Sequence, residues 1–151
     1  MFNIVLHQPQ IPPNTGNIAR LCVATNSKLH IIRPIAFFLD DKTMRRAGCD
    51  YWEHLDLEIH DSLSDLYSKA GDTNFYYVSK FGKMRYSEID YKDGDYLIFG
   101  SEQHGLPKEV LETNSDKTLF IPMSGPARSL NLSNSVAVVL YEAIRQICIC
   151  K

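Results

Sequence analysis

Residues that could bind an anion gather near the N-terminus, in the segment from Pro12 to Arg20. Two prolines stop the preceding apolar run, and Asn14 or Thr15 is placed to cap a new helix. The free amide groups of a first helical turn favour a negatively charged ligand. Arg20 lies about one and a half turns further along and can project towards the same end. A capped helix with a solvent-facing arginine explains the segment equally well.

A second candidate segment is the loop that follows the apolar run Tyr96–Phe99. Gly100 at a strand end would let a flat ligand approach the backbone closely, at the edge where open α/β sheets bind ligands. Pro107 suits the first turn of a short helix. The Lys-Ser/Thr pair of a phosphate-binding loop and the G-x-G-x-x-G dinucleotide fingerprint are both absent from the sequence. Glu102 is suited either to chemistry or to capping the turn.

A third segment joins the apolar run Thr118–Ile121 to the last helix that the sequence predicts. It is a Pro/Gly loop, and hydroxyl or amide side chains crowd the helical turn that follows it, namely Ser129, Asn131, Ser133 and Asn134. One capping side chain is enough for a helix. The surplus favours a lined binding site over capping alone.

The elements that must position these segments alternate between short apolar runs and stretches of helical length. This alternation predicts an α/β domain with a mainly parallel sheet that helices cover on both faces. Helices are predicted over Asn14–Thr25 and over Ser62–Ala70, the second capped by Asp61 or Ser62 and ended by Gly71. We expect one domain over residues 1–151. The predicted strands are Phe2–Leu6, Leu29–Ile32, Leu57–His60, Phe75–Ser79, Tyr96–Phe99 and Thr118–Ile121.

The clearest element is a helix that starts at Asn131, for which Ser129 or Asn131 offers a capping oxygen. Its apolar stripe comprises Leu132, Val136, Val139, Leu140, Ala143, Ile144 and Ile147, at i, i+3 and i+4 spacing. Val138, Tyr141 and Ile149 widen the apolar surface beyond what one sheet can cover. The helix therefore favours a homodimer.

The formal net charge of −2 argues against a nucleic-acid-binding protein when it is taken alone. The charges are distributed unevenly along the chain. Residues 1–50 carry six Lys/Arg and three Asp/Glu, whereas residues 51–75 carry one lysine and six acids. A local cationic face could therefore meet phosphates, although ordinary variation along a solvated surface explains the charges more simply. No apolar run approaches the ~20 residues of a membrane span, so we expect a cytoplasmic protein.

No metal site is predicted. The four cysteines, at positions 22, 49, 148 and 150, lack the pairwise spacing of a zinc site. His54 and His60 lie near Cys49, but six residues apart with acids between them they make a poor set of ligands.

Taken together, the three segments closely resemble the three motifs of the SPOUT 2′-O-ribose methyltransferases. The matching residues run in order from Asn14 to Arg20, from Phe99 to Pro107, and from Ile121 to Asn134. The match is closest to the short TrmL type, which methylates the wobble cytidine or uridine of tRNA, and it covers essentially the whole chain. Each motif alone is moderately specific, but three in order at the family's spacing are a strong signal.

This resemblance implies a deep trefoil knot at the carboxyl end, through which the last helix is threaded, and a homodimer whose sites take residues from both subunits. It implies S-adenosylmethionine as the cofactor and no separate RNA-binding extension. Relatives often have Pro at position 101 and Thr-Arg at 103–104, where this chain has Ser101, Gln103 and His104. A phosphate contact at position 104 would then depend on protonation of the histidine. The cofactor-binding residues implied are Val78, Ser79, Phe99, Gly100, Glu102, Gly105, Ile121, Pro122, Met123, Ser129, Leu130 and Ser133.

The resemblance also implies catalytic roles. Asn14, Glu102 and Asn131 match polar site positions that orient ribose and cofactor. Arg20 matches the family's catalytic arginine, but a guanidinium keeps its proton, so we expect it to clamp phosphate and stabilise the developing alkoxide. Tyr141 is then the better candidate to relay the proton.

The expected substrate is the anticodon stem-loop of tRNA, and leucine tRNAs are the expected isoacceptors. Splayed single-stranded bases would stack on aromatic side chains, for which Tyr51, Trp52 and Phe81 are candidates. Two alternatives remain open: a non-catalytic RNA-binding protein on the same scaffold, and the same chemistry at another RNA site. The predicted RNA-binding residues are Arg20, Lys42, Arg45, Arg46 and Arg128, helped by Arg33, Lys80 and Lys83.

Overall fold

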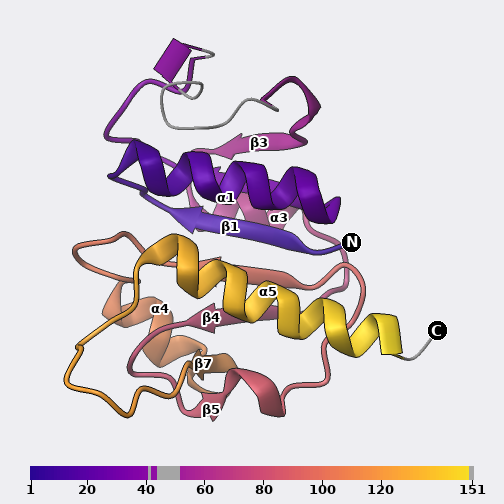
Figure 1. Ribbon diagram of the computed structural model, residues 1–151, viewed down its shortest axis with the longest axis vertical. Helices are drawn as coiled ribbons and strands as arrows, with labels where there is room; N and C mark the ends of the chain where they lie inside the picture. Colours follow the sequence, from indigo (N-terminus) through magenta and orange to yellow (C-terminus); the bar gives the residue numbers. More distant parts are fainter. Residues whose placement is uncertain (41, 44–51, 150–151) are drawn as a thin grey trace.

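The computed structural model describes residues 1–40, 42–43 and 52–149. Its strands form one seven-stranded sheet in the order β3-β2-β1-β6-β4-β7-β5 (Figure 1). Every pair of neighbouring strands is parallel, which confirms the α/β prediction. The strands are β1 Asn3–His7, β2 Lys28–Ile32, β3 Leu57–His60, β4 Phe75–Val78, β5 Met84–Arg85, β6 Tyr96–Phe99 and β7 Thr118–Phe120.

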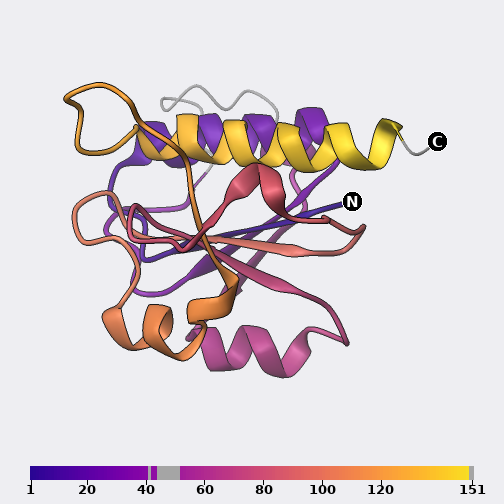
Figure 2. The ribbon, with the colours of Figure 1, turned by 90° about the horizontal axis from the view of Figure 1, so that it is seen from below.

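Helices cover both faces of this sheet, as predicted (Figure 2). The two longest, α1 and α5, lie side by side over one face, and α3 and α4 lie on the other (Figures 1 and 2). The α-helices are α1 Pro12–Thr25, α3 Leu63–Lys69, α4 Lys108–Thr113 and α5 Leu132–Ile149, and the short 3₁₀ helices are η1 Trp52–His54, η2 Tyr86–Glu88 and η3 Ser115–Lys117.

The central strands are buried on both faces because each face is covered. In β1, Ile4 and Leu6 join the core beneath α1 and α5, whereas Val5 points to the core beneath α3. Strand β6 alternates in the same way, with Phe99 on the α1/α5 face and Ile98 on the other. This double burial explains why the strands read as nearly continuous apolar runs.

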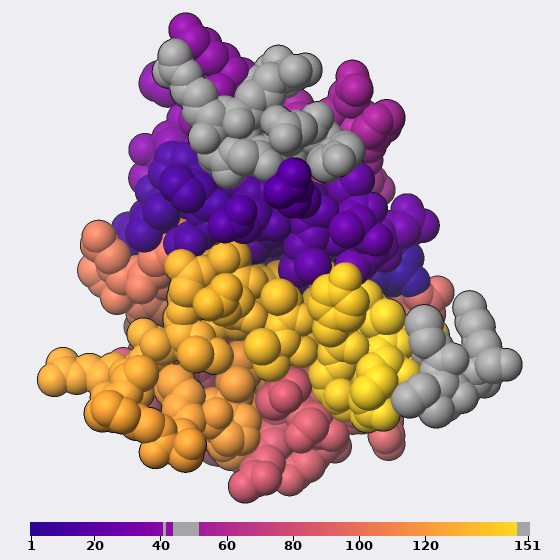
Figure 3. Space-filling view, in the orientation of Figure 1, coloured from indigo at the N-terminus to yellow at the C-terminus, as the bar shows by residue number. Residues whose placement is uncertain are grey.

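Helix α5 presents the predicted apolar stripe to the sheet and to α1. Val136, Val139, Leu140 and Ala143 are fully buried. Val138 and Tyr141 stay exposed, the tyrosine by 55%. Figure 3 shows α1 and α5 next to each other on one broad face of the molecule. Of the described helices, none is long and apolar enough to cross a membrane.

The start of α1 corrects the predicted cap. The helix begins at Pro12 with Ile11 at the N-cap position, where no side chain makes a capping hydrogen bond. Asn14 and Thr15 lie inside the first turns and are buried. Because a proline has no N–H to satisfy, prolines at the first positions reduce the need for a capping side chain.

Two other helix starts agree with the sequence. Ser62 caps α3 by accepting a hydrogen bond from the Asp65 amide at 3.1 Å. Asn131 Oδ1 accepts a hydrogen bond from the Ser133 amide at 2.9 Å at the start of α5.

Strand β5 was missed by the sequence analysis, since two residues are too few to make an apolar run. The trefoil knot stays a prediction.

Candidate active site

A cavity of about 940 Å³ lies at the carboxyl ends of four neighbouring strands, β1, β6, β4 and β7. Each strand contributes its last residue or the residue that follows: His7, Phe99, Val78 and Ile121. The first turn of α1, the loop after β6 and the segment before α5 complete the lining. This is the edge at which open parallel sheets bind ligands.

Most of the predicted cofactor residues line this cavity, namely Val78, Ser79, Phe99, Gly100, Glu102, Gly105, Ile121, Met123, Ser129 and Leu130. The predicted catalytic residues Asn14 and Asn131 line it as well. Pro122 and Ser133 do not belong to the lining. The Ser133 hydroxyl instead donates to Asn131 Oδ1 at 2.7 Å, so it orients a residue that does.

Gly100 is required for a reason that differs from the predicted approach of a ligand. A Cβ atom at this position would lie 2.0 Å from the carbonyl carbon of Gly105 and 2.2 Å from the Leu106 nitrogen. Ser101 and Gly105 exchange two backbone hydrogen bonds, at 3.2 and 2.9 Å, and Gly105 adopts a φ of +69°. The glycines therefore allow the loop to fold back on its own strand, which makes one wall of the cavity.

The carboxylate of Glu102 joins this loop to the start of α1. One oxygen, Oε2, accepts the Gln10 amide at 2.9 Å, and Oε1 accepts the Ile11 amide at 3.1 Å. The Asn14 side-chain amide also donates to Oε1, at 3.1 Å. A negative charge beside the first turn of a helix is favourable. Both oxygens are thus engaged in holding the start of α1 beside the loop after β6.

Asn14 carries the connection on to α5. Its Oδ1 accepts a hydrogen bond from Asn131 Nδ2 at 2.9 Å, across 117 positions of sequence. The orientation of both amides follows from their partners, because only the nitrogen can donate to the Glu102 carboxylate. The three motif segments found in the sequence therefore meet in one hydrogen-bonded chain.

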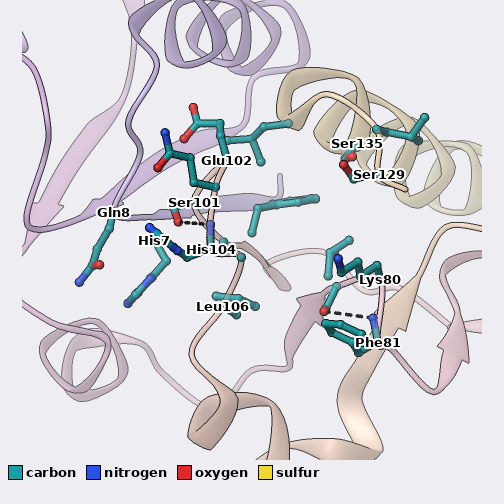
Figure 4. A pocket seen from close by; sticks show the side chains of 18 of the residues that line it. His7, Gln8, Lys80, Phe81, Ser101, Glu102, His104, Leu106, Ser129 and Ser135 are labelled. Carbon is teal, nitrogen blue, oxygen red and sulfur yellow. Dashed lines mark hydrogen bonds between the residues drawn. The ribbon is translucent and has the colours of Figure 1, made fainter. Parts of the chain in front are cut away.

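Sequence reasoning missed the lining residues His7 and Gln8, whereas Lys80 and Phe81 were already candidates for RNA binding. Figure 4 shows His7 and Gln8 at one end and Lys80 and Phe81 at the other, with Leu106 between them. Burial lowers the pKa of His7, so its ring is neutral and offers one donor and one acceptor. These residues follow directly after predicted strands, and that position is the signal that could have found them.

Lys80 and Phe81 form an exposed pair at their end of the cavity. The Lys80 ammonium lies 5.0 Å from the centroid of the Phe81 ring, and the ring is 74% exposed. An exposed ring beside a cation suits stacking of a base next to a phosphate. Of the other aromatic candidates, Trp52 packs partly buried against the core, and Tyr51 lies outside the described residues.

The other predicted site residues are not brought into the cavity. Arg20 and Tyr141 are exposed on the neighbouring helices α1 and α5, and neither belongs to the lining. Lys42 and Arg128 are exposed and also lie outside it. The remaining predicted RNA-binding residues, Arg45 and Arg46, fall outside the described part of the chain.

The fold and the cavity together define an α/β protein with a candidate ligand site at the carboxyl ends of a parallel sheet. The sequence profile of the SpoU rRNA Methylase family matches residues 1–141, and the chain belongs to this family. The resemblance that the three motifs indicated is thereby confirmed.

Individual relatives agree. A protein of Escherichia coli strain K12, named tRNA (cytidine(34)-2'-O)-methyltransferase, is 45% identical over 148 residues, which cover 97% of this chain and 94% of the relative. A structure described as giving structural insights into the 2-OH methylation of C/U34 on tRNA has a TM-score of 0.93 at 45% identity, covering 98% of this chain and 97% of that one. The SpoU methyltransferase AviRb of Streptomyces viridochromogenes, in complex with the cofactor AdoMet, has a TM-score of 0.84 at 25% identity, covering 97% and 57%.

Because backbone atoms approach Gly100 closely, adding a single methyl group at this position should lower the stability of the protein. Gly100→Ala should lower the free energy of unfolding by roughly 1–3 kcal/mol or more, because backbone atoms would have to move. The matched control is Gly71→Ala, where a Cβ would meet nothing within 4 Å and the change should stay within about 0.5 kcal/mol. Urea unfolding measures both. Equal stability of the two variants would contradict the packing described.

Proposed function

We propose that this protein transfers the methyl group of S-adenosylmethionine to the ribose 2′-hydroxyl of nucleotide 34, the wobble cytidine or uridine of tRNA. One observation carries the proposal: three motif segments, joined through Glu102, Asn14 and Asn131, surround a single cavity at the carboxyl edge of the sheet. Close relatives are named for this reaction, and a neighbouring structure describes it. The alternative of a non-catalytic RNA-binding protein has no comparable support, because the cofactor segments are intact.

The cavity suits the cofactor. The Gln10 side-chain oxygen Oε1 is buried in its lining without a hydrogen-bond partner among the described residues, which leaves an acceptor for a ligand. Apolar walls come from Phe99, Ile121 and Leu130, and Ser79 and Ser129 offer hydroxyls. When bound, S-adenosylmethionine supplies a methyl group that its sulfonium makes electrophilic.

Methyl transfer to a hydroxyl requires the ribose oxygen in line with the methyl carbon and a place for its proton. Asn14 and Asn131, held by their hydrogen bonds to each other and to Glu102, orient the ribose and exclude misplaced water. Because the carboxylate of Glu102 already accepts from the β1–α1 loop and from Asn14 of α1, we assign the proton to another group. Tyr141 takes this role in our proposal, and Arg20 clamps the adjacent phosphate.

Arg20 and Tyr141 can serve one site only if a second subunit brings them to it, since both are exposed on α1 and α5 and line no part of the cavity of their own chain. The proposal therefore includes a homodimer formed through the shared face of α1 and α5. Burying Val138 and Tyr141 there would remove exposed apolar surface. A tRNA substrate also implies a cytoplasmic enzyme.

The RNA-binding surface in this proposal combines a stacking platform at the cavity with cationic side chains, namely Arg20, Lys42, Arg45, Arg46 and Arg128. Phe81, beside Lys80, is the described aromatic residue that lines the cavity and remains exposed. A splayed wobble base would stack on its ring while phosphates meet the lysine. The domain acts on tRNA as one unit over residues 1–151.

The reaction itself gives the first test. Purified protein should convert cytidine or uridine 34 of a leucine tRNA to its 2′-O-methyl form only when S-adenosylmethionine is present, and EDTA should not abolish the activity. Nucleoside mass spectrometry of the tRNA measures the product, and a tRNA lacking the anticodon stem-loop is the control. Methylation at a different RNA position would show that the enzyme acts on another site and would refute nucleotide 34 as its target. Absence of methylation despite bound cofactor would favour the non-catalytic alternative.

Assembly gives the second test. Val138→Asp should weaken dimerisation and methyl transfer together, because it places a charge in the apolar face of α5. The control, Ser64→Asp on α3, adds the same charge to an exposed position on the opposite face of the sheet and should change neither. Analytical ultracentrifugation at micromolar concentration measures association. A stable monomer for the unmodified chain would refute the shared site.

The third test separates the two candidates for handling the proton. Tyr141→Phe should lower turnover by about 10²–10⁴-fold with little effect on tRNA affinity. Arg20→Lys should keep part of the activity, since a point charge remains, whereas Arg20→Ala should lose several kcal/mol of transition-state stabilisation. Single-turnover kinetics and cofactor titration measure both. Near-normal turnover of Tyr141→Phe would show that Tyr141 is not the proton acceptor and would leave Arg20 or water in that role.

A further inference from the structure

A cluster of side chains near the β3 edge of the sheet has no role in the site described above. His30 on β2 is paired in register with Glu58 on β3, and His60 follows two residues after Glu58. Alternate residues of a strand point to the same face, and here that face carries α3. The two imidazoles are almost completely buried, with 2% and 1% exposed, and stack at a centroid distance of 5.2 Å. None of the three lines the cavity.

Asn3 determines which nitrogen of His30 carries the proton. Its Nδ2 donates to the Gly94 carbonyl at 2.8 Å, so its Oδ1 must be the atom that faces His30 Nε2 at 3.1 Å. An amide oxygen can only accept, and Nε2 is therefore the protonated nitrogen. A neutral His30 ring carries only this one proton. Its other nitrogen, Nδ1, then presents a lone pair inside the cluster.

That lone pair points at the second imidazole. His30 Nδ1 lies 3.0 Å from His60 Nε2. On the far side of the second ring, His60 Nδ1 lies 3.4 Å from Asp65 Oδ2 and makes no hydrogen bond with the described residues. A carboxylate accepts and does not donate, so it favours the proton of a neutral His60 on Nδ1.

Without an ion, the two inner nitrogens share a hydrogen bond at 3.0 Å. If both rings carry their protons on the outer nitrogens, the two inner nitrogens instead present lone pairs that can bind a cation. We propose that His30 Nδ1, His60 Nε2 and the Glu58 carboxylate bind a divalent transition-metal ion such as Zn²⁺. Their candidate ligand atoms all lie within 4.8 Å of one another. Two imidazoles and one carboxylate are a common zinc ligand set, which leaves a fourth position for water.

The surroundings of the three ligands match those of metal sites in other proteins. A metal-bound imidazole usually donates its second N–H to an amide or carboxylate oxygen, which fixes the ring. Asn3 Oδ1 provides this acceptor for His30, and Asp65 Oδ2, at 3.4 Å from His60 Nδ1, is the carboxylate oxygen that could provide it for His60. Glu58 is 34% exposed, so the ion can reach the buried nitrogens from its side.

Lys28 is the competitor for this site. Its ammonium lies 3.0 Å from Glu58 Oε2, so a metal ion must draw the carboxylate away from an existing ion pair. A second lysine, Lys69, lies 3.7 Å from Glu58 Oε1. Removing the Lys28 charge should therefore strengthen metal binding, an effect that a merely structural histidine pair would not show.

The test uses untagged protein stripped with EDTA and titrated with ZnCl₂ by calorimetry. About one Zn²⁺ should bind per chain, and it should raise the Tm by several degrees, because it binds only the folded protein. Glu58→Gln, at a partly exposed position, should weaken binding at least about tenfold, as an amide is a poorer zinc ligand. Lys28→Met should tighten it, and His54→Asn, at an exposed histidine outside the cluster, should leave it unchanged.

His60→Asn should abolish zinc binding. If that variant does not fold, Glu58→Gln still tests the proposal, because Glu58 is partly exposed and its replacement disturbs the core less. Absence of stoichiometric binding, or binding that Glu58→Gln and Lys28→Met leave unaltered, would overturn the proposal and indicate that a shared proton alone lies between the rings. Visible absorption of the Co²⁺-substituted protein would report the coordination geometry. Neither result bears on methyl transfer, because the cluster lies outside the cavity.

Discussion

The carboxylate of Glu102 holds together segments that are far apart in the sequence. It accepts two backbone amides of the β1–α1 loop and the side-chain amide of Asn14, which in turn accepts from Asn131 at the start of α5. A partly buried carboxylate that lost these donors would keep its charge without compensation, and this is strongly unfavourable. The shape of the cavity therefore depends on a single residue in the loop after β6.

The parallel sheet places that residue where it can act. Because all strands run in one direction, their carboxyl ends and the loops that follow share one edge, and the cavity forms between them. The same arrangement leaves α1 and α5 side by side on one face (Figure 3), and Val138 and Tyr141 of α5 remain exposed. The parallel topology thus produces both the cavity and the exposed face of α1 and α5. In our proposal a second subunit packs on that face and completes the site.

The His30–His60 pair shows that strands of one sheet can serve two unrelated purposes. The cavity uses strand ends, whereas the pair uses the middle of β2 and the end of β3, on the face that α3 covers. On its outer sides the pair faces side chains from two other elements: Asn3 of β1 accepts a hydrogen bond from His30, and Asp65 of α3 lies 3.4 Å from His60. The arrangement of the rings therefore depends on the packing of several elements. The residues named for methyl transfer are not among them.

The sequence by itself determined every strand of the sheet except β5, the buried stripe of α5 and the three motif segments, because each is a local pattern of burial or of turn residues. It could not determine which side chains meet. Glu102 and Asn14, or His30 and His60, are partners only because the strand order and register bring their positions together. Likewise, Arg20 and Tyr141 were grouped with the cavity residues, yet helices α1 and α5 direct them to the exposed face. Contacts between distant residues follow from the packing of whole elements, which no local pattern in the sequence specifies.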